Sequence, residues 1–114
     1  MNKNEQLDLN LLGDYLTNLG KPTLVKMIAL YEQQVALYLQ NIEQAIADES
    51  QSLWQEHCHK MKGAAGSVGL TQVHLLLVTL EKSTESFATK AAELDKLKSL
   101  NKKATAEFQQ WLSK

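Results

Sequence analysis

The sequence predicts an all-α protein: an antiparallel up-down bundle of four helices with a short extra helix at its N-terminal end. Leu, Ala, Glu, Gln and Lys, which have high helix propensity, dominate the 114 residues. One proline and five glycines are the main helix breakers among them. Apolar residues recur at spacings of three and four over most of the chain, and amphipathic helices with short connections bury their apolar faces most simply in such a bundle.

The first helix is expected over residues 7–19. Its apolar positions are Leu9, Leu12, Tyr15, Leu16 and Leu19. Gly20 follows directly and can end a helix, because glycine adopts the left-handed backbone conformation without strain. This helix is short, so we expect it to cap one end of the bundle.

The second helix is expected over residues 22–47, with Pro22 in its first turn, where the missing N–H costs nothing. Its apolar positions alternate by three and four residues: Leu24, Ile28, Tyr31, Val35, Tyr38, Ile42 and Ile46. The pattern predicts a long helix with one buried face.

The third helix is expected over residues 50–68, with Asp48 and Ser50 as candidate N-caps and Gly69 as the residue that ends it. One side of it carries Trp54, His57, Met61, Ala64, Ala65 and Val68. This side is predicted to face the core, with Cys58 at the edge of the core.

The last two helices are expected over residues 71–82, capped by Thr71, and residues 87–112, with a turn between Ser83 and Ser86. Their apolar positions are Val73, Leu76, Leu77 and Leu80 in the fourth helix, and Leu94, Leu97, Ala104, Phe108 and Trp111 in the fifth. These helices complete the bundle.

Size and charge limit the kind of partner. A chain of 114 residues has the usual length of one domain, so residues 1–114 are expected to form a single domain. The formal net charge is -1, with 12 basic and 13 acidic residues, so no excess positive field favours nucleic acid or an anionic membrane. A protein partner or a small molecule is the better expectation.

The cysteine content and the lack of long apolar runs suggest a compartment. Cys58 is the only cysteine, so no intramolecular disulfide and no CxxC metal or redox pair can form, which fits a reducing cytoplasm. No apolar run approaches the roughly 20 residues that span a bilayer, and no signal segment is recognisable. We expect a cytoplasmic protein.

The exposed side of the third helix carries the candidate functional residues. With about 100° of rotation per residue, His59 lies roughly 160° from Met61 and points to water, whereas His57 turns toward the core. The residues expected on the same exposed face as His59 are Gln55, Glu56, Gly63 and Gly66. His57 is expected to be a hydrogen-bonded histidine at the core boundary, because buried polar groups usually find partners.

The residue types around His59 suit phosphoryl chemistry. An exposed neutral imidazole is a nucleophile near neutral pH and can accept a phosphoryl group, with which Lys62 could pair. Gly63 and Gly66 each cost a helix about 1 kcal/mol against alanine, so helix stability did not select them. They leave a bare surface on which the active site of another protein could approach the helix.

The stretch from His59 to Gly69, HKMKGAAGSVG, resembles the signature of the histidine-containing phosphotransfer (HPt) family. That signature reads His, any residue, a large aliphatic residue, Lys, Gly, two small residues, and later an aliphatic residue and Gly. Within the family the resemblance is greatest to the HPt domain of an anoxic redox-control sensor kinase. The order of helices and glycines resembles the family over nearly the whole chain, although many members carry alanine where Cys58 stands.

The resemblance implies a phosphoryl carrier in a multistep two-component phosphorelay. His59 would accept the phosphoryl group from a receiver-domain aspartate and pass it to, or back from, a response regulator. Lys62 would stabilise the phosphohistidine, and Gly63 would leave room for the receiver. The resemblance also implies a carrier without kinase activity or a cofactor of its own, since the Mg²⁺ that drives transfer belongs to the partner receiver. We expect a monomer, because a relay module fits the chain better than a dimerisation domain does.

Three other functions fit parts of the sequence. A metal or haem site could use His57, Cys58 and His59, but the two histidines lie roughly 200° apart around the helix and cannot ligate one ion. A sensor-kinase dimerisation domain would need a following ATP-binding domain, which 114 residues cannot contain. A helical adaptor that binds a protein partner through the same glycine-bearing face stays open, and only the His59 motif argues against it.

Overall fold

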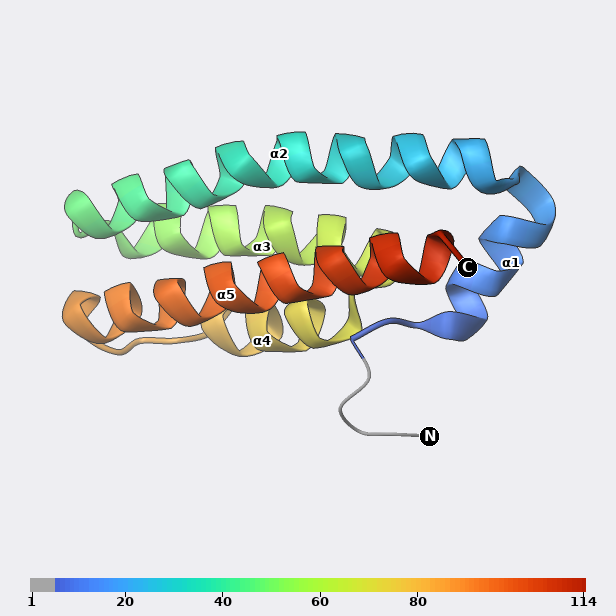
Figure 1. The fold of residues 1–114 in the computed structure, drawn as a ribbon. Helices are drawn as coiled ribbons and strands as arrows, with labels where there is room; N and C mark the ends of the chain where they lie inside the picture. The colour runs from blue at the N-terminus through green and yellow to red at the C-terminus, as the bar shows by residue number, and fades with distance from the viewer. Residues whose placement is uncertain (1–5) are drawn as a thin grey trace.

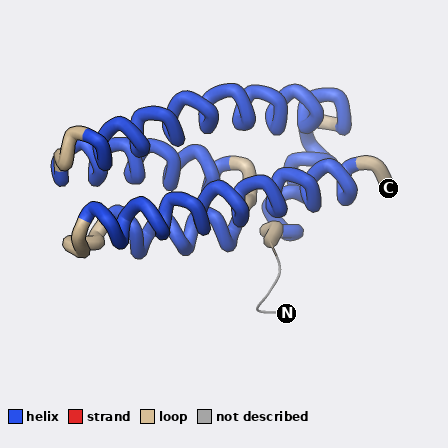
Figure 2. Tube along the Cα trace, turned by 60° about the vertical axis from the view of Figure 1, so that its left-hand side comes forward, coloured by secondary structure: helices blue, strands red, loops and turns tan. Residues whose placement is uncertain are grey.

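The computed structural model describes residues 6–114, which form five α helices (Figure 1). These are α1 (Leu9–Leu19), α2 (Lys21–Ala47), α3 (Gln51–Ser67), α4 (Thr71–Glu81) and α5 (Phe87–Leu112). The connections from α2 to α3 and from α4 to α5 lie at the same end of the bundle (Figure 2). The all-α prediction is confirmed, and four antiparallel helices form the bundle while α1 lies across its other end.

Glycines with positive φ and a side-chain cap mark helix ends and a helix start where the sequence predicts them. Gly20 and Gly69 have φ values of +85° and +74°, in the left-handed region that glycine adopts without strain. The Ser50 hydroxyl accepts a hydrogen bond from the Leu53 N–H at 3.3 Å, which makes Ser50 the N-cap of α3. Every predicted helix bound lies within two residues of the observed one.

The start of α1 and the cap of α4 were predicted wrongly, and the reason is one contact. Leu7 was expected in the first helix, but it forms an isolated antiparallel bridge with Leu70. The Asp8 carboxylate therefore caps α1 by accepting from the Leu11 N–H at 3.1 Å. Thr71 is the first residue of α4 rather than its cap, since Leu70 occupies the cap position without a side-chain hydrogen bond.

The hydrophobic core lies inside the bundle, between the apolar faces of its four helices. Its fully buried large apolar side chains are Leu12, Leu24, Val35, Ile42, Trp54, Met61, Leu70, Leu77, Leu80, Leu97 and Phe108. Helix α3 packs against both α2 and α4. A larger part of its circumference is therefore buried than a single helical wheel suggests. No helix within residues 6–114 is long and apolar enough to cross a membrane.

Two expectations for α3 are corrected, the burial of Cys58 and the hydrogen bonding of His57. Cys58 was placed at the edge of the core, but it is completely buried, and burial raises the pKa of its thiol to about 12. A thiol that stays protonated is a packing group rather than a nucleophile. His57 is half-buried as expected, but its buried Nδ1 has no hydrogen-bond partner.

Lys90 fixes the end of the bundle opposite α1. It is completely buried, and its ammonium donates a hydrogen bond to the Glu85 carbonyl oxygen. The same ammonium lies 5.5 Å from the ring centre of Trp54 and 4.9 Å from that of Phe87. The hydrogen bond to Glu85 and the cation–π contact with Trp54 together join the loop before α5 to the core.

We expect Lys90→Ala to lower the free energy of unfolding by about 3 kcal/mol, because it opens a cavity beside Trp54 and removes the donor to the Glu85 carbonyl. Urea unfolding followed by circular dichroism measures this change. The exposed Lys96 on the same helix is the matched control, and Lys96→Ala should change the same free energy by less than about 0.5 kcal/mol. Equal losses in the two variants would contradict the role of Lys90.

Candidate functional site

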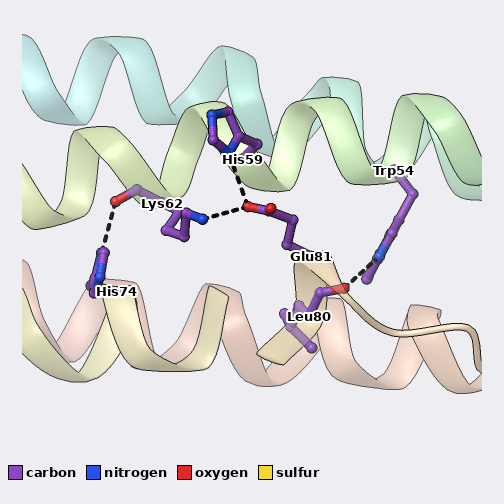
Figure 3. A network of polar contacts seen from close by, with 6 residues as sticks. All are labelled: Trp54, His59, Lys62, His74, Leu80 and Glu81. Carbon is purple, nitrogen blue, oxygen red and sulfur yellow. Dashed lines mark hydrogen bonds and ion pairs between the residues drawn. The ribbon is translucent and has the colours of Figure 1, made fainter. Parts of the chain in front are cut away.

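His59 lies on the exposed side of α3, as predicted, and its imidazole contacts a carboxylate on α4 (Figure 3). The side chain is 67% exposed, and its Nδ1 lies 3.1 Å from Oε1 of Glu81. A carboxylate only accepts hydrogen bonds, so Nδ1 must carry the proton in this contact. In the neutral ring, the lone pair is then on Nε2, the nitrogen that Glu81 does not occupy.

Lys62 lies beside His59 and shares its carboxylate partner. The Lys62 ammonium lies 2.8 Å from the same Oε1 atom of Glu81. Both side chains are mostly covered, with exposed fractions of 24% for Lys62 and 22% for Glu81. The hydrogen bond from Lys62, and secondarily that from His59, lowers the pKa of the Glu81 carboxyl. The carboxylate is therefore ionised at neutral pH and holds both basic groups.

Glu81 is a site residue that the sequence analysis missed. It is the last residue of α4, 22 positions after His59, and no motif in the chain marks it. One available signal was its position four residues after the buried Leu77, at the edge of the apolar stripe of α4. A carboxylate at such an edge faces the neighbouring helix, which here is α3.

Two further polar contacts fix α4 against α3 (Figure 3). The Trp54 indole N–H donates to the Leu80 carbonyl oxygen at 2.7 Å, directly before Glu81. The His74 Nδ1 lies 3.1 Å from the Lys62 carbonyl oxygen. The Trp54 contact fixes the end of α4 that carries Glu81. The His74 contact holds the backbone of Lys62, and the ammonium of Lys62 in turn binds Glu81.

The two glycines of the motif have different environments. A Cβ atom built on Gly63 would meet nothing within 4 Å, so this position is open as predicted. A Cβ atom on Gly66 would lie only 3.0 Å from Nδ1 of His74. The expectation that Gly66 clears the surface beside His59 is therefore corrected, because its bare side is filled by a histidine of α4.

The other predicted docking residues lie on the surface of α3. Gln55 is exposed, and the carboxylate of Glu56 lies 3.4 Å from the Lys60 ammonium, one helical turn away. An exposed pair of this kind contributes little to stability. That Gln55 and Glu56 contact a partner protein stays a prediction.

An apolar groove of about 370 Å³ lies between α2 and the C-terminal half of α3. Its lining includes Met27, Leu30, Tyr31, Ala64, Ser67 and Val68. Leu30 is 58% exposed. Ala64, Ser67 and Val68 belong to the motif, so the groove borders the motif on the side of α3 that faces α2.

A shared metal site was one of the alternatives raised by the sequence. Among residues 6–114, no group of three or more His, Cys, Asp or Glu side chains is placed to hold a metal ion. His59 and Lys62 instead meet at the carboxylate of Glu81. The geometry thus presents one exposed imidazole with a fixed proton on one nitrogen and a cation beside it.

Comparisons with known proteins match this chain to one family. The family model described as Hpt domain matches residues 26–112. The aerobic respiration control sensor protein ArcB of Escherichia coli K12 is 33% identical over 70 residues, which make up 61% of this chain and 9% of that protein. ArcB of Shigella flexneri matches to the same extent.

Two solved structures of the histidine-containing phosphotransfer domain of ArcB from Escherichia coli resemble the whole fold. Each superposes with a TM-score of 0.83 at 23% sequence identity. One match covers 95% of this chain and 93% of the solved chain, and the other covers 97% and 90%. At this identity the likeness shows a shared helical fold.

Proposed function

Because the chain belongs to the Hpt domain family, the histidine phosphotransfer domains of multistep phosphorelays, we propose that His59 is its phosphoryl-carrying residue. The observation that supports this role is the contact of His59 Nδ1 with Glu81 at 3.1 Å on an imidazole that is 67% exposed. This contact leaves Nε2 as the nucleophilic atom at the surface.

The transfer step follows from that arrangement. The Nε2 lone pair of His59 attacks the phosphorus of an aspartyl phosphate in a receiver domain. The N–P bond forms while the P–O bond to the aspartate breaks, and the electron pair of that bond leaves with the aspartate carboxylate. Nδ1 keeps its proton, and the Glu81 carboxylate stabilises the positive charge that the ring gains as Nε2 bonds to phosphorus. Transfer to a response regulator is the reverse reaction with a second receiver.

Lys62 is the residue that would bind the transferred phosphoryl group. It lies three residues after His59, a spacing that places two side chains next to each other on a helix. Its ammonium and the His59 ring both contact the same Glu81 oxygen, so the ammonium is held close to the ring. A charge-assisted contact with a phosphoryl oxygen would then form without a large movement of the side chain.

We assign no kinase activity and no cofactor to this chain. The partners are the receiver domains of a hybrid sensor kinase and of a response regulator, and the Mg²⁺ that assists transfer would be bound by the receiver. The chain matches only 9% of the length of the sensor protein ArcB, so the wider pathway of that protein is not carried over. We propose that the carrier acts as a monomer.

A labelled phosphoryl transfer experiment tests this function. The protein is mixed with a receiver domain that carries a ³²P-labelled aspartyl phosphate, with Mg²⁺ present. Label should appear on this chain in an acid-labile, alkali-stable form, the behaviour of a phosphohistidine. If receivers bind but none of them transfers label, the chain is the helical adaptor instead.

The open surface at Gly63 gives a second prediction. Gly63→Leu should weaken receiver binding by tenfold or more, about 1.4 kcal/mol, because the new side chain occupies the space beside His59. The helix itself should not be destabilised, since leucine has higher helix propensity than glycine. Isothermal titration with an unphosphorylated receiver measures the affinity.

The matched control for that prediction is Gly13→Leu. Gly13 is a helical glycine of α1 whose Cβ position is also empty within 4 Å. This variant should bind the receiver as the wild-type protein does. Unchanged affinity in Gly63→Leu would show that the receiver does not approach this part of α3.

A further inference from the structure

Two residues of α4 hold Lys62, one at each end of that residue (Figure 3). At the side-chain end, the Glu81 carboxylate lies 2.8 Å from the ammonium. At the backbone end, His74 Nδ1 lies 3.1 Å from the carbonyl oxygen. A carbonyl oxygen only accepts, so the Nδ1–H of His74 is the donor. His74 and Glu81 are seven residues apart, about two helical turns, and therefore lie on the same face of α4.

Gly66 makes the backbone contact possible. A Cβ atom at this position would lie 3.0 Å from His74 Nδ1 and 3.4 Å from its Cε1, which is closer than side-chain atoms normally approach. Without a Cβ atom, the imidazole rests directly on the backbone of α3. It can then reach the carbonyl of Lys62, one turn before Gly66. Gly66 and His74 are thus a matched pair across two helices.

The hydrogen bond to Lys62 is what orients the His74 ring. His74 is half-buried and also borders a cleft of about 330 Å³, together with Asp8, Gly66, Gly69 and Thr71. The ring is therefore not enclosed by packing on the side of the cleft. The Lys62 carbonyl and the bare backbone at Gly66, which itself lines the cleft, are the contacts that define the position of the ring.

On the basis of the phosphotransfer function proposed above, we infer that His74 is a positioning residue for the transfer reaction. Its hydrogen bond sets the backbone of Lys62 against α4, so that the Lys62 ammonium and the Glu81 carboxylate stay beside the His59 ring. His74 does not touch the phosphoryl group. Its effect on the reaction passes through Lys62.

A pair of substitutions separates this role from simple packing. His74→Leu keeps an apolar bulk of similar size but removes the donor, and it should slow transfer from a phosphorylated receiver about tenfold, because small displacements of reacting groups are costly. His74→Asn places an amide N–H where Nδ1 stood, and it should restore most of the wild-type rate. The hydrolysis rate of the phosphohistidine should rise in the Leu variant and not in the Asn variant.

The glycine provides an independent second test that does not alter His74. Gly66→Ala should displace the imidazole and slow transfer, whereas Gly13→Ala, a helical glycine in open space, should leave transfer unchanged. In a protein that already carries His74→Leu, Gly66→Ala should cause little further loss. The ¹⁵N shifts of the His59 ring should change in the single Gly66 variant, since the tautomer depends on the placement of Glu81.

The outcomes distinguish this inference from the proposed function. If the wild-type protein takes up no label, both the phosphotransfer function and the positioning role of His74 are overturned. If the wild-type protein takes label and His74→Leu transfers at the same rate, only the positioning role is overturned. Equal slowing in His74→Leu and His74→Asn, with equal loss of stability and unchanged His59 ring shifts, would also overturn it, because that pattern indicates packing alone.

Discussion

His59→Gln is expected to take up no label from a phosphorylated receiver. The glutamine amide can form hydrogen bonds, but its nitrogen lone pair is delocalised and does not attack phosphorus. No other described residue replaces the imidazole, because the remaining histidines lie elsewhere. His57 turns into the bundle with a buried Nδ1, and His74 donates to the backbone of α3. Filter-bound ³²P after mixing with the receiver measures the effect.

The control for this prediction is His57→Gln, which should accept label at close to the wild-type rate. It replaces a histidine of the same helix that does not share the Glu81 contact. Circular dichroism of both variants should show a folded bundle. Label on His59→Gln at the wild-type rate would mean that the phosphoryl group is carried by another residue.

Replacing Glu81 should have the second largest effect. Glu81→Leu removes the carboxylate that holds the His59 ring and the Lys62 ammonium. Hydrogen bonds to charged groups contribute about 1.5 to 3 kcal/mol, and a loss of about 2 kcal/mol in the transition state slows transfer about 30-fold. Glu81→Gln keeps an oxygen acceptor without the charge, so its rate should lie between those of the wild type and Glu81→Leu. Rapid-quench transfer kinetics measure all three proteins.

The same carboxylate predicts a pH dependence of stability. The pKa of the Glu81 carboxyl is lower in the folded protein than its ordinary value of 4.5. Its contacts therefore stabilise the fold fully at pH values above 4.5, and this stabilisation is lost as the pH falls through the lowered pKa of the folded state. The wild-type protein should therefore lose more stability than Glu81→Gln on acidification from pH 7 into this range. Identical urea midpoints for the two proteins at every pH would contradict the contact.

The fold was largely predictable because each helix carries its own pattern. The long second helix was recognised from its apolar spacing, and Gly20 and Gly69 marked helix ends by their backbone freedom. The bridge between Leu7 and Leu70 was not predictable, because it joins residues far apart in the sequence with no pattern in either. It altered the start of α1 and the cap of α4 without altering the bundle.

Only the part of the candidate site that lies on α3 could be predicted, because the rest depends on contacts between helices. His59 and Lys62 lie on one helix, so the wheel and the motif identify them together. Glu81 and His74 come from α4, and their contacts depend on how α4 is placed along α3, which no single-helix pattern specifies. The misplacement of Gly66 has the same cause, because a wheel shows which side is bare but not which neighbour fills it.

His59 should carry the phosphoryl group on Nε2, because Glu81 holds Nδ1. The most direct measurement is a two-dimensional NMR experiment that correlates ³¹P with the ring nitrogens of ¹⁵N-labelled His59 after transfer from a receiver. A ³¹P coupling to Nε2 of His59 and a proton on Nδ1 are expected. A ³¹P coupling to Nδ1, or to a nitrogen of any other histidine, would contradict this assignment.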